Sequence, residues 1–245
     1  MIRAITFLKR LRFYIAFFCF CSISTLFYSN EISIDGKLDD SYWESAEEYS
    51  KFYETFPFTL RAPSSFQKVL IFEDSDGIYF GFINQQKKDQ VRANKHERDD
   101  EMSNADKVGV SIDFDGNGLV AYSFSVSAGG SISDGIYRNE NEINYDWDAD
   151  WKSGVYVDED FWYAEIFIPW TIAPMKSVEG PRREVKINFW RLLASEWKIN
   201  SSIKGNARQE KYMSLFHAYE FNNYSISKID FFPYLTISDL SLIHI

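Results

Sequence analysis

The fold is decided by residues 107–127, which run Lys107-Val-Gly-Val-Ser-Ile-Asp-Phe114, Asp115-Gly-Asn-Gly118 and Leu119-Val-Ala-Tyr-Ser-Phe-Ser-Val-Ser127. Apolar residues take alternate positions in the first and third segments, and successive side chains of a strand point to opposite faces. The middle segment has the glycine and aspartate content of a tight turn. The stretch therefore predicts an antiparallel hairpin of half-buried strands, with Lys107, Ser111 and Asp113 on the face away from the core.

Alternating stretches recur along the rest of the chain, at residues 68–73, 78–84, 154–157, 162–168 and 185–193. Helical patterns are few. Residues 38–46 are expected to form a short helix, capped by Asp35 or Asp39, with Trp43 pointing inward, and residues 169–173 a single turn. Many short strands separated by turns predict an all-β fold, an antiparallel β-sandwich with jelly-roll or immunoglobulin-like layering and one or two short helices.

Composition excludes several classes of protein. The chain has 245 residues, of which 45% are hydrophobic and 18% aromatic, and this argues against disorder. Lys and Arg total 26 against 36 Asp and Glu, a net charge of −10 that repels phosphate backbones, so no nucleic-acid partner is expected. The three histidines are scattered, and no His-Glu-x-x-His or Gly-x-Ser-x-Gly motif is present, so no catalytic residue is predicted.

The first 29 residues are predicted to be a signal peptide. Four basic residues precede a short apolar run, residues 13–20, which has the layout of a secretory signal; an uncleaved amphipathic anchor is the alternative. Both cysteines, Cys19 and Cys21, fall inside this segment, so the exported part has no cysteine. An exported, acidic, cysteine-free domain fits the periplasm, the outer membrane or the cell surface of a Gram-negative bacterium.

Four motifs, in this order, resemble those of the family 9 carbohydrate-binding modules: Ile34-Asp-Gly-Lys-Leu-Asp-Asp-Ser-Tyr-Trp43, Gly77-Ile-Tyr-Phe-Gly-Phe82, Asp106-Lys-Val-Gly-Val-Ser-Ile-Asp113 and Trp162-Tyr-Ala-Glu-Ile-Phe-Ile-Pro169. The resemblance covers roughly residues 32–220. It implies a β-sandwich over residues 30–222 and a non-catalytic domain that binds a polysaccharide or oligosaccharide, linked to polysaccharide binding or catabolism at the cell envelope.

A bacterial subgroup that carries this domain before an outer-membrane β-barrel is similar in three further stretches: Arg98-Asp-Asp100, Trp147-Asp-Ala-Asp-Trp151 and Ile187-Asn-Phe-Trp-Arg191. That comparison implies that residues 223–245, with Phe231-Phe-Pro-Tyr-Leu235, are the start of a truncated barrel. A barrel domain is then an expected partner.

Sugars are bound by aromatic faces and by planar polar side chains that bond their hydroxyls. Tryptophans in polar surroundings and one polar loop supply the candidates, which are Trp147, Trp151, Trp190, Arg138 and Asn139, with Trp197, Tyr137 and Asn141 nearby in the sequence. The resemblance also marks a departure: the family's sugar-contacting Trp and Glu correspond here to Ser103 and Gly109, so its sugar clamp is absent from these positions.

Oxygen donors at alternate positions around Gly116 form a candidate Ca²⁺ site of Asp113, Asp115 and Asn117, with Asp99, Asp100 and Glu101 as further donors. A solvated turn is the alternative interpretation. The resembled family binds structural calcium, which the resemblance extends to this chain as an expectation. No other cofactor is predicted.

Three other functions remain open at this point. The domain could act as a periplasmic plug or docking domain for an outer-membrane barrel, without a sugar ligand. Glycoside hydrolase activity requires two carboxylates about 5–10 Å apart, and 36 acids always contain such pairs, so their number decides nothing. Haem binding is the weakest alternative, because none of the four methionines pairs with a histidine in an obvious way.

Overall fold

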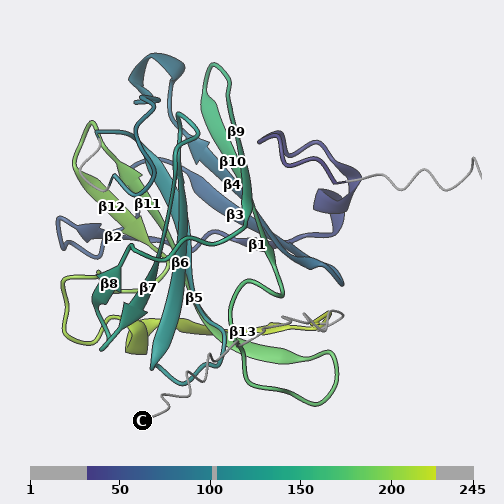
Figure 1. Cartoon of the computed structure of the whole chain (residues 1–245). Coiled ribbons are helices and arrows are strands. Elements are labelled where there is room, and N and C mark those ends of the chain that lie inside the picture. Colours follow the sequence, from purple (N-terminus) through teal and green to yellow (C-terminus); the bar gives the residue numbers. More distant parts are fainter. Residues whose placement is uncertain (1–31, 101–103, 225–245) are drawn as a thin grey trace, which may run out of the picture. The chain divides into compact units, whose positions relative to one another are not determined.

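A computed structural model describes residues 32–100 and 104–224. Over these residues the strands form two antiparallel sheets (Figure 1). The first sheet has the order β1 (Glu47–Tyr49), β3 (Gln67–Glu73), β4 (Gly77–Gln85), β10 (Phe161–Pro169) and β9 (Lys152–Val157). The second has the order β2 (Tyr53–Phe56), β12 (Lys198–Ser201), β11 (Arg183–Leu193), β5 (Lys107–Asp113), β6 (Val120–Ser127), β7 (Ile132–Arg138) and β8 (Glu142–Asn144).

The long strand β11 organises the second sheet. One edge of β11 pairs with β5 through residues 186–192. The opposite edge is shared, because residues 190–193 pair with β12 and residues 183–187 pair with β13 (His217–Phe221). The predicted hairpin is confirmed as β5 and β6, which pair from Lys107↔Ser127 to Ile112↔Tyr122.

The main core lies between the two sheets. Alternate residues of each strand point into it, among them Phe80 and Ile166 from the first sheet and Val110, Phe124 and Phe189 from the second. The Phe80 and Phe189 rings meet across the interface with centroids 5.5 Å apart. The predicted all-β sandwich is therefore confirmed, since two sheets bury their apolar faces against each other.

The prediction that β5 is half buried is wrong, because every residue of this strand is buried. Lys107, Ser111 and Asp113 are covered although they lie on the face opposite the core. Part of that face carries a second apolar cluster, made of Ala121, Tyr137, Ile203, Tyr212, Met213 and Phe216. Lys107 and Asp113 have other partners, since Lys107 Nζ donates to the Asp100 carbonyl and the Asp113 carboxylate accepts from the backbone N–H groups of Asp115 and Gly118. Much of the apolar cluster belongs to an irregular segment without periodicity. The alternation in β5 therefore could not predict that the outer face of β5 is buried.

Helical structure in the described residues is limited to three short 3₁₀ helices, η1 (Ser41–Ser45), η2 (Lys88–Gln90) and η3 (Met213–Leu215). The predicted helix at residues 38–46 is thus shorter than expected, and Asp40 precedes it without a capping side-chain bond. The Asp35 carboxylate instead accepts from the Lys37 backbone N–H at 2.9 Å. The predicted inward orientation of Trp43 is confirmed, since its side chain is buried.

The predictions for residues 1–29, and for the barrel segment with Phe231–Leu235, lie outside the described residues. Within the described ranges, no helix has the length and apolar character that crossing a bilayer would require.

Candidate functional site

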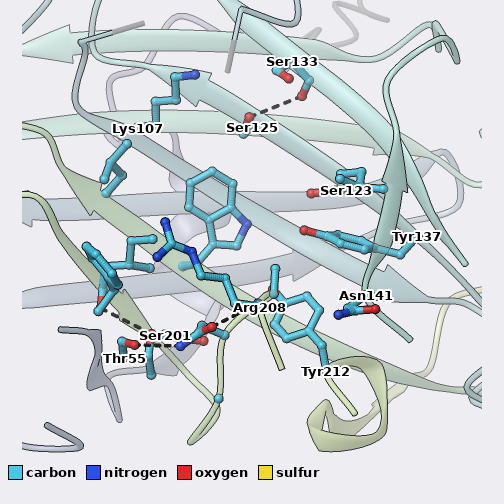
Figure 2. Close-up of a pocket in the computed structure, with 18 of the residues that line it drawn as sticks. Thr55, Lys107, Ser123, Ser125, Ser133, Tyr137, Asn141, Ser201, Arg208 and Tyr212 are labelled. Atoms are coloured by element: carbon cyan, nitrogen blue, oxygen red, sulfur yellow. Dashed lines mark hydrogen bonds between the residues drawn. The ribbon is translucent and has the colours of Figure 1, made fainter. Parts of the chain in front are cut away.

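A pocket of about 380 Å³ opens on the face of the second sheet that points away from the core (Figure 2). Its floor comes from β5, β6, β7 and β11, and its walls come from β2, β12, the segment after β8 and the loop that contains residues 205–212. The pocket therefore borders the second apolar cluster, with which it shares Tyr137 and Tyr212.

Small residues in register make the floor of the pocket. Across the sheet, Trp190 pairs with Gly109, Gly109 with Ser125, and Ser125 with Ser133. The adjacent row brings Ser111 beside Ser123, with 3.1 Å between their hydroxyl oxygens. Side chains this small leave a hollow in the sheet surface and line it with hydroxyl groups.

Trp190 lies directly on this floor. A Cβ added at Gly109 would stand 2.6 Å from Cε2 and Cζ2 of the indole, a distance that no real Cβ adopts. The glycine is therefore required for the indole to lie against the β5 backbone. The side chain stays partly exposed and lines the pocket, so its remaining surface is available to a ligand.

Other aromatic side chains form the walls. Tyr137 and Tyr212 pack edge to face with ring centroids 5.3 Å apart. The Tyr212 hydroxyl accepts a hydrogen bond from Asn188 Nδ2 at 2.9 Å, and burial raises the pKa of Tyr212 to about 12, so the hydroxyl stays neutral. Trp197 also lines the pocket and is 63% exposed.

Charged groups in the pocket differ in their partners. Burial raises the pKa of Asp134, while bonds from Ala149 N at 2.8 Å and Arg98 Nη2 at 2.6 Å oppose that rise. Lys107 Nζ donates to the backbone carbonyl of Asp100 at 2.9 Å. The Arg208 guanidinium lies 4.7 Å above the centre of the Phe56 ring.

The residues predicted to bind a ligand lie in different places. Trp190 lines the pocket, as do the neighbouring candidates Tyr137 and Asn141. Trp151 is only 6% exposed and belongs to the core, and Trp147 packs on the same core with its ring 5.0 Å from that of Tyr122.

Arg138 and Asn139 are exposed at the turn between β7 and β8, where Asn139 Nδ2 donates to Glu142 Oε2 at 2.8 Å. The structure thus gathers one of the five predicted binding residues into the pocket and places Trp147, Trp151, Arg138 and Asn139 outside its lining.

Sequence reasoning did not select most of the pocket, including Ser123, Ser125, Ser133, Arg208 and Tyr212. The serines carried a usable pattern, because small residues at every second position of β6 face away from the core. Arg208 and Tyr212 lie in irregular segments, where no periodicity indicates which way a side chain points.

The candidate calcium ligands form a turn in which the side chains of Asp113, Asp115 and Asn117 each accept a hydrogen bond. Asp113 Oδ2 accepts from Gly118 N at 2.6 Å, Asn117 Oδ1 accepts from Leu119 N at 2.9 Å, and Asp115 Oδ1 accepts from Arg183 Nη2 at 2.9 Å. These bonds account for the conformation of the turn, and calcium at this position stays a prediction.

A second acidic group brings together Asp99, Asp134 and Asp148, whose ligand atoms lie within 4.8 Å of one another. Arg98 contacts all three carboxylates, at 3.6, 2.6 and 2.8 Å respectively. The guanidinium thus supplies the positive charge that this group requires.

No family model matches the chain, and no curated protein matches its sequence. Solved structures do match. A family 9 carbohydrate-binding module from Caldicellulosiruptor kristjanssonii in complex with glucose has a TM-score of 0.52 at 13% identity, covering 82% of this chain and 96% of that module. Its complex with cellotriose gives the same score and identity over 83% and 96%.

A Bacteroides uniformis protein assigned provisionally to carbohydrate binding gives a TM-score of 0.50 at 12% identity, covering 69% of this chain and 85% of that protein. The chain therefore has the fold of the family 9 modules, as the four sequence motifs implied.

Proposed function

We propose that the chain is a non-catalytic carbohydrate-binding domain and that the pocket on the second sheet holds the sugar. One observation carries this proposal: the partly exposed Trp190 indole lies in a hollow lined by serine hydroxyls. An indole offers a flat surface for the C–H face of a pyranose, and hydroxyl groups beside it bond to the sugar's own hydroxyls. The likeness to modules whose structures contain glucose and cellotriose supports the same ligand class.

The pocket lacks a glutamate at position 109, where the resemblance implies a sugar-contacting residue of the family. Gly109 corresponds to the family's sugar-contacting Glu, and here that glycine lies beneath Trp190. Ser103, which corresponds to the family's Trp, is outside the described residues. We therefore infer that this chain holds its sugar with Trp190 on the sheet and with Trp197 at the mouth of the pocket.

Binding is favoured over hydrolysis by the charges in the pocket. A glycosidase needs two carboxylates about 5–10 Å apart on either side of the bond that breaks. Among the described residues that line the pocket, Asp134 is the one acid, and Arg98 holds its carboxylate. A pocket of this kind retains a sugar without supplying an acid and a base.

The test is a glycan array with the full chain, followed by calorimetric titration of each retained oligosaccharide. Trp190→Ala should lower affinity at least about tenfold, since loss of a central aromatic contact costs 1.4 kcal/mol or more. Tyr156→Ala removes a 41% exposed aromatic from the other sheet and should leave affinity unchanged. Retention of no polysaccharide, or equal affinities of wild type and Trp190→Ala, would overturn the proposal.

We further propose that the domain acts at the cell envelope of a Gram-negative bacterium, in polysaccharide catabolism and next to a barrel domain. The support is the basic and apolar layout of residues 1–29 and the resemblance of residues 223–245 to the start of such a barrel. Cell fractionation should place the native protein in the periplasmic or outer-membrane fraction, and a cytoplasmic location would contradict this proposal.

A further inference from the structure

The pocket contains one arginine, Arg208, whose guanidinium forms no ion pair with a described residue. Three lining residues of the described chain carry charge, namely Lys107, Asp134 and Arg208. The Asp134 carboxylate is compensated by Arg98, and the Lys107 ammonium is turned toward the Asp100 carbonyl. No carboxylate of the described residues lies within 4.0 Å of the Arg208 guanidinium.

The Arg208 side chain is held in place although it lacks an ion-pair partner. Its Cζ atom lies over the Phe56 ring, 4.7 Å from the ring centroid, and Phe56 also lines the pocket. Figure 2 shows the side chain extending over the pocket from its loop. A cation–π contact of this kind holds the guanidinium near the ring, and its N–H groups can still bond an anion.

A positive charge in the pocket stands out against the negative net charge of the whole chain. A net charge of −10 repels polyanions, so an acidic polysaccharide would be bound only where a local positive charge compensates. Arginine forms paired hydrogen bonds with carboxylate and with similar oxyanions, and such bonds are about twice as strong as those between neutral groups. An arginine beside an indole and several serines therefore combines the contacts that a charged sugar requires.

We propose that the pocket selects a glycan whose bound unit carries a negative group, a uronate carboxylate or a sulfate ester, which pairs with Arg208. The inference rests on the proposed carbohydrate-binding function and specifies its ligand class. Trp190 stacks on the sugar ring, Ser125 and Ser133 lie beside it for its hydroxyls, and Arg208 bonds the anionic group.

The test compares matched charged and neutral oligosaccharides by calorimetric titration of the full chain at constant ionic strength. One pair is trigalacturonate and its methyl ester, and the other is a sulfated galacto-oligosaccharide and its desulfated form. Wild type should prefer the charged member of one pair at least tenfold, and the pair that shows this preference identifies the anionic group. In Arg208→Gln the preference should fall to about one, while the neutral member keeps its affinity.

A matched control separates a specific contact from general attraction. Lys204→Gln removes a cation of the same charge from the same loop, where Lys204 lies over Tyr53 at 5.2 Å and does not line the pocket. The preference should survive this change. Its loss in Lys204→Gln as well as in Arg208→Gln would show that only net charge matters and would overturn the inference.

The two proposals fail in different ways. Equal affinity of wild type for charged and neutral sugars, together with loss of both in Trp190→Ala, would overturn the choice of an anionic glycan and leave carbohydrate binding in place. Failure of wild type to bind any member of either pair or any sugar of the glycan array would overturn both.

Discussion

Glu165 is the residue on which the N-terminal part of the sandwich depends. It lies in the middle of β10 without exposed surface, and four donors converge on its carboxylate. Oε2 accepts from the backbone N–H groups of Asp35 at 2.8 Å and Gly36 at 2.7 Å. Oε1 accepts from Trp43 Nε1 at 3.0 Å and from the Tyr42 hydroxyl at 3.3 Å. The motif at residues 34–43 thus supplies four hydrogen-bond donors to the Glu165 carboxylate.

Replacement of Glu165 by Gln should lower the free energy of unfolding by about 3 kcal/mol. The amide would present an N–H₂ group to donors and leave at least one buried donor without an acceptor, in addition to losing charge-assisted bonds. Denaturant unfolding measures the change, with Glu159→Gln, an exposed carboxylate beside Lys88, as the control expected to stay within about 0.5 kcal/mol. A loss no larger than the control's would contradict this role for Glu165.

For single residues, the sequence indicated which ones matter better than it indicated which residues they contact. It placed Asp35 and Gly36 in one family-like motif and Glu165 in another. That the backbone of Asp35 and Gly36 bonds the Glu165 carboxylate could not be predicted, because these residues are about 130 positions apart and nothing local links them. In the same way it listed Trp190 as a binding candidate without showing that Gly109 makes room for it.

Strands were predictable where apolar residues alternate or follow one another between turn residues. β3, β4, β5, β6, β9, β10 and β11 were predicted, β3 and β4 from mainly apolar runs, and each is found within two residues of the predicted bounds. The strands β1, β2, β8, β12 and β13 were missed because they have three to five residues each.

β7 was missed for another reason, since its centre is Ser133-Asp134-Gly135, residues that usually weaken a strand. Asp134 is tolerated there because Arg98, a residue outside the sheet, bonds its carboxylate. The partner of Asp134 is 36 residues away in the sequence, so no local pattern indicates it.

The short strand β13 makes stability depend on pH. Its first residue, His217, stacks on the Tyr49 ring of the other sheet with centroids 4.9 Å apart, and Nε2 lies 3.2 Å from Ser202 Oγ. Burial lowers the pKa of His217 below its ordinary value of 6.5. The folded state therefore binds fewer protons at this site than the unfolded state.

The free energy of unfolding should consequently fall as pH decreases from 6.5 toward the lowered pKa of His217, by at most about 1.4 kcal/mol per pH unit for one proton. Measured at pH 7.5 and 5.5, the wild type should lose more stability than His217→Phe, which keeps an aromatic ring beside Tyr49. Carboxylates titrate in both proteins, so the difference isolates this histidine. An equal loss in the two proteins would contradict the prediction.

At the scale of the whole molecule, composition and alternation were enough to predict two sheets around one core. They could not predict that the outer face of the second sheet is itself covered along one side. Residues 203–216 form that cover and include Tyr212 and Met213, yet they have neither strand nor helix periodicity. The pocket exists because the cover is incomplete, and its position follows from tertiary packing alone.

The net charge of −10 should make stability depend on salt. Acidic groups repel one another across the folded surface, and this repulsion is screened over about 10 Å at 0.1 M salt. The unfolding midpoint of the full chain is expected to rise by about 2 °C between 10 and 200 mM NaCl, as calorimetry or circular dichroism can measure. A midpoint that falls with salt would mean that favourable ion pairs outweigh the repulsion.

The glycine and serine residues of the pocket floor carry no charge and offer only backbone and hydroxyl groups to a ligand. In the proposed mode of binding, Trp197 and Arg208, which line the pocket from irregular segments, supply the contacts that differ most from backbone and hydroxyl groups. Replacing those segments should change which ligand the domain binds, while the hydrogen bonds between the strands of the second sheet stay the same. Sequence differences between domains with this pocket are then expected mainly in those irregular segments. These segments are therefore the place to introduce a new ligand specificity.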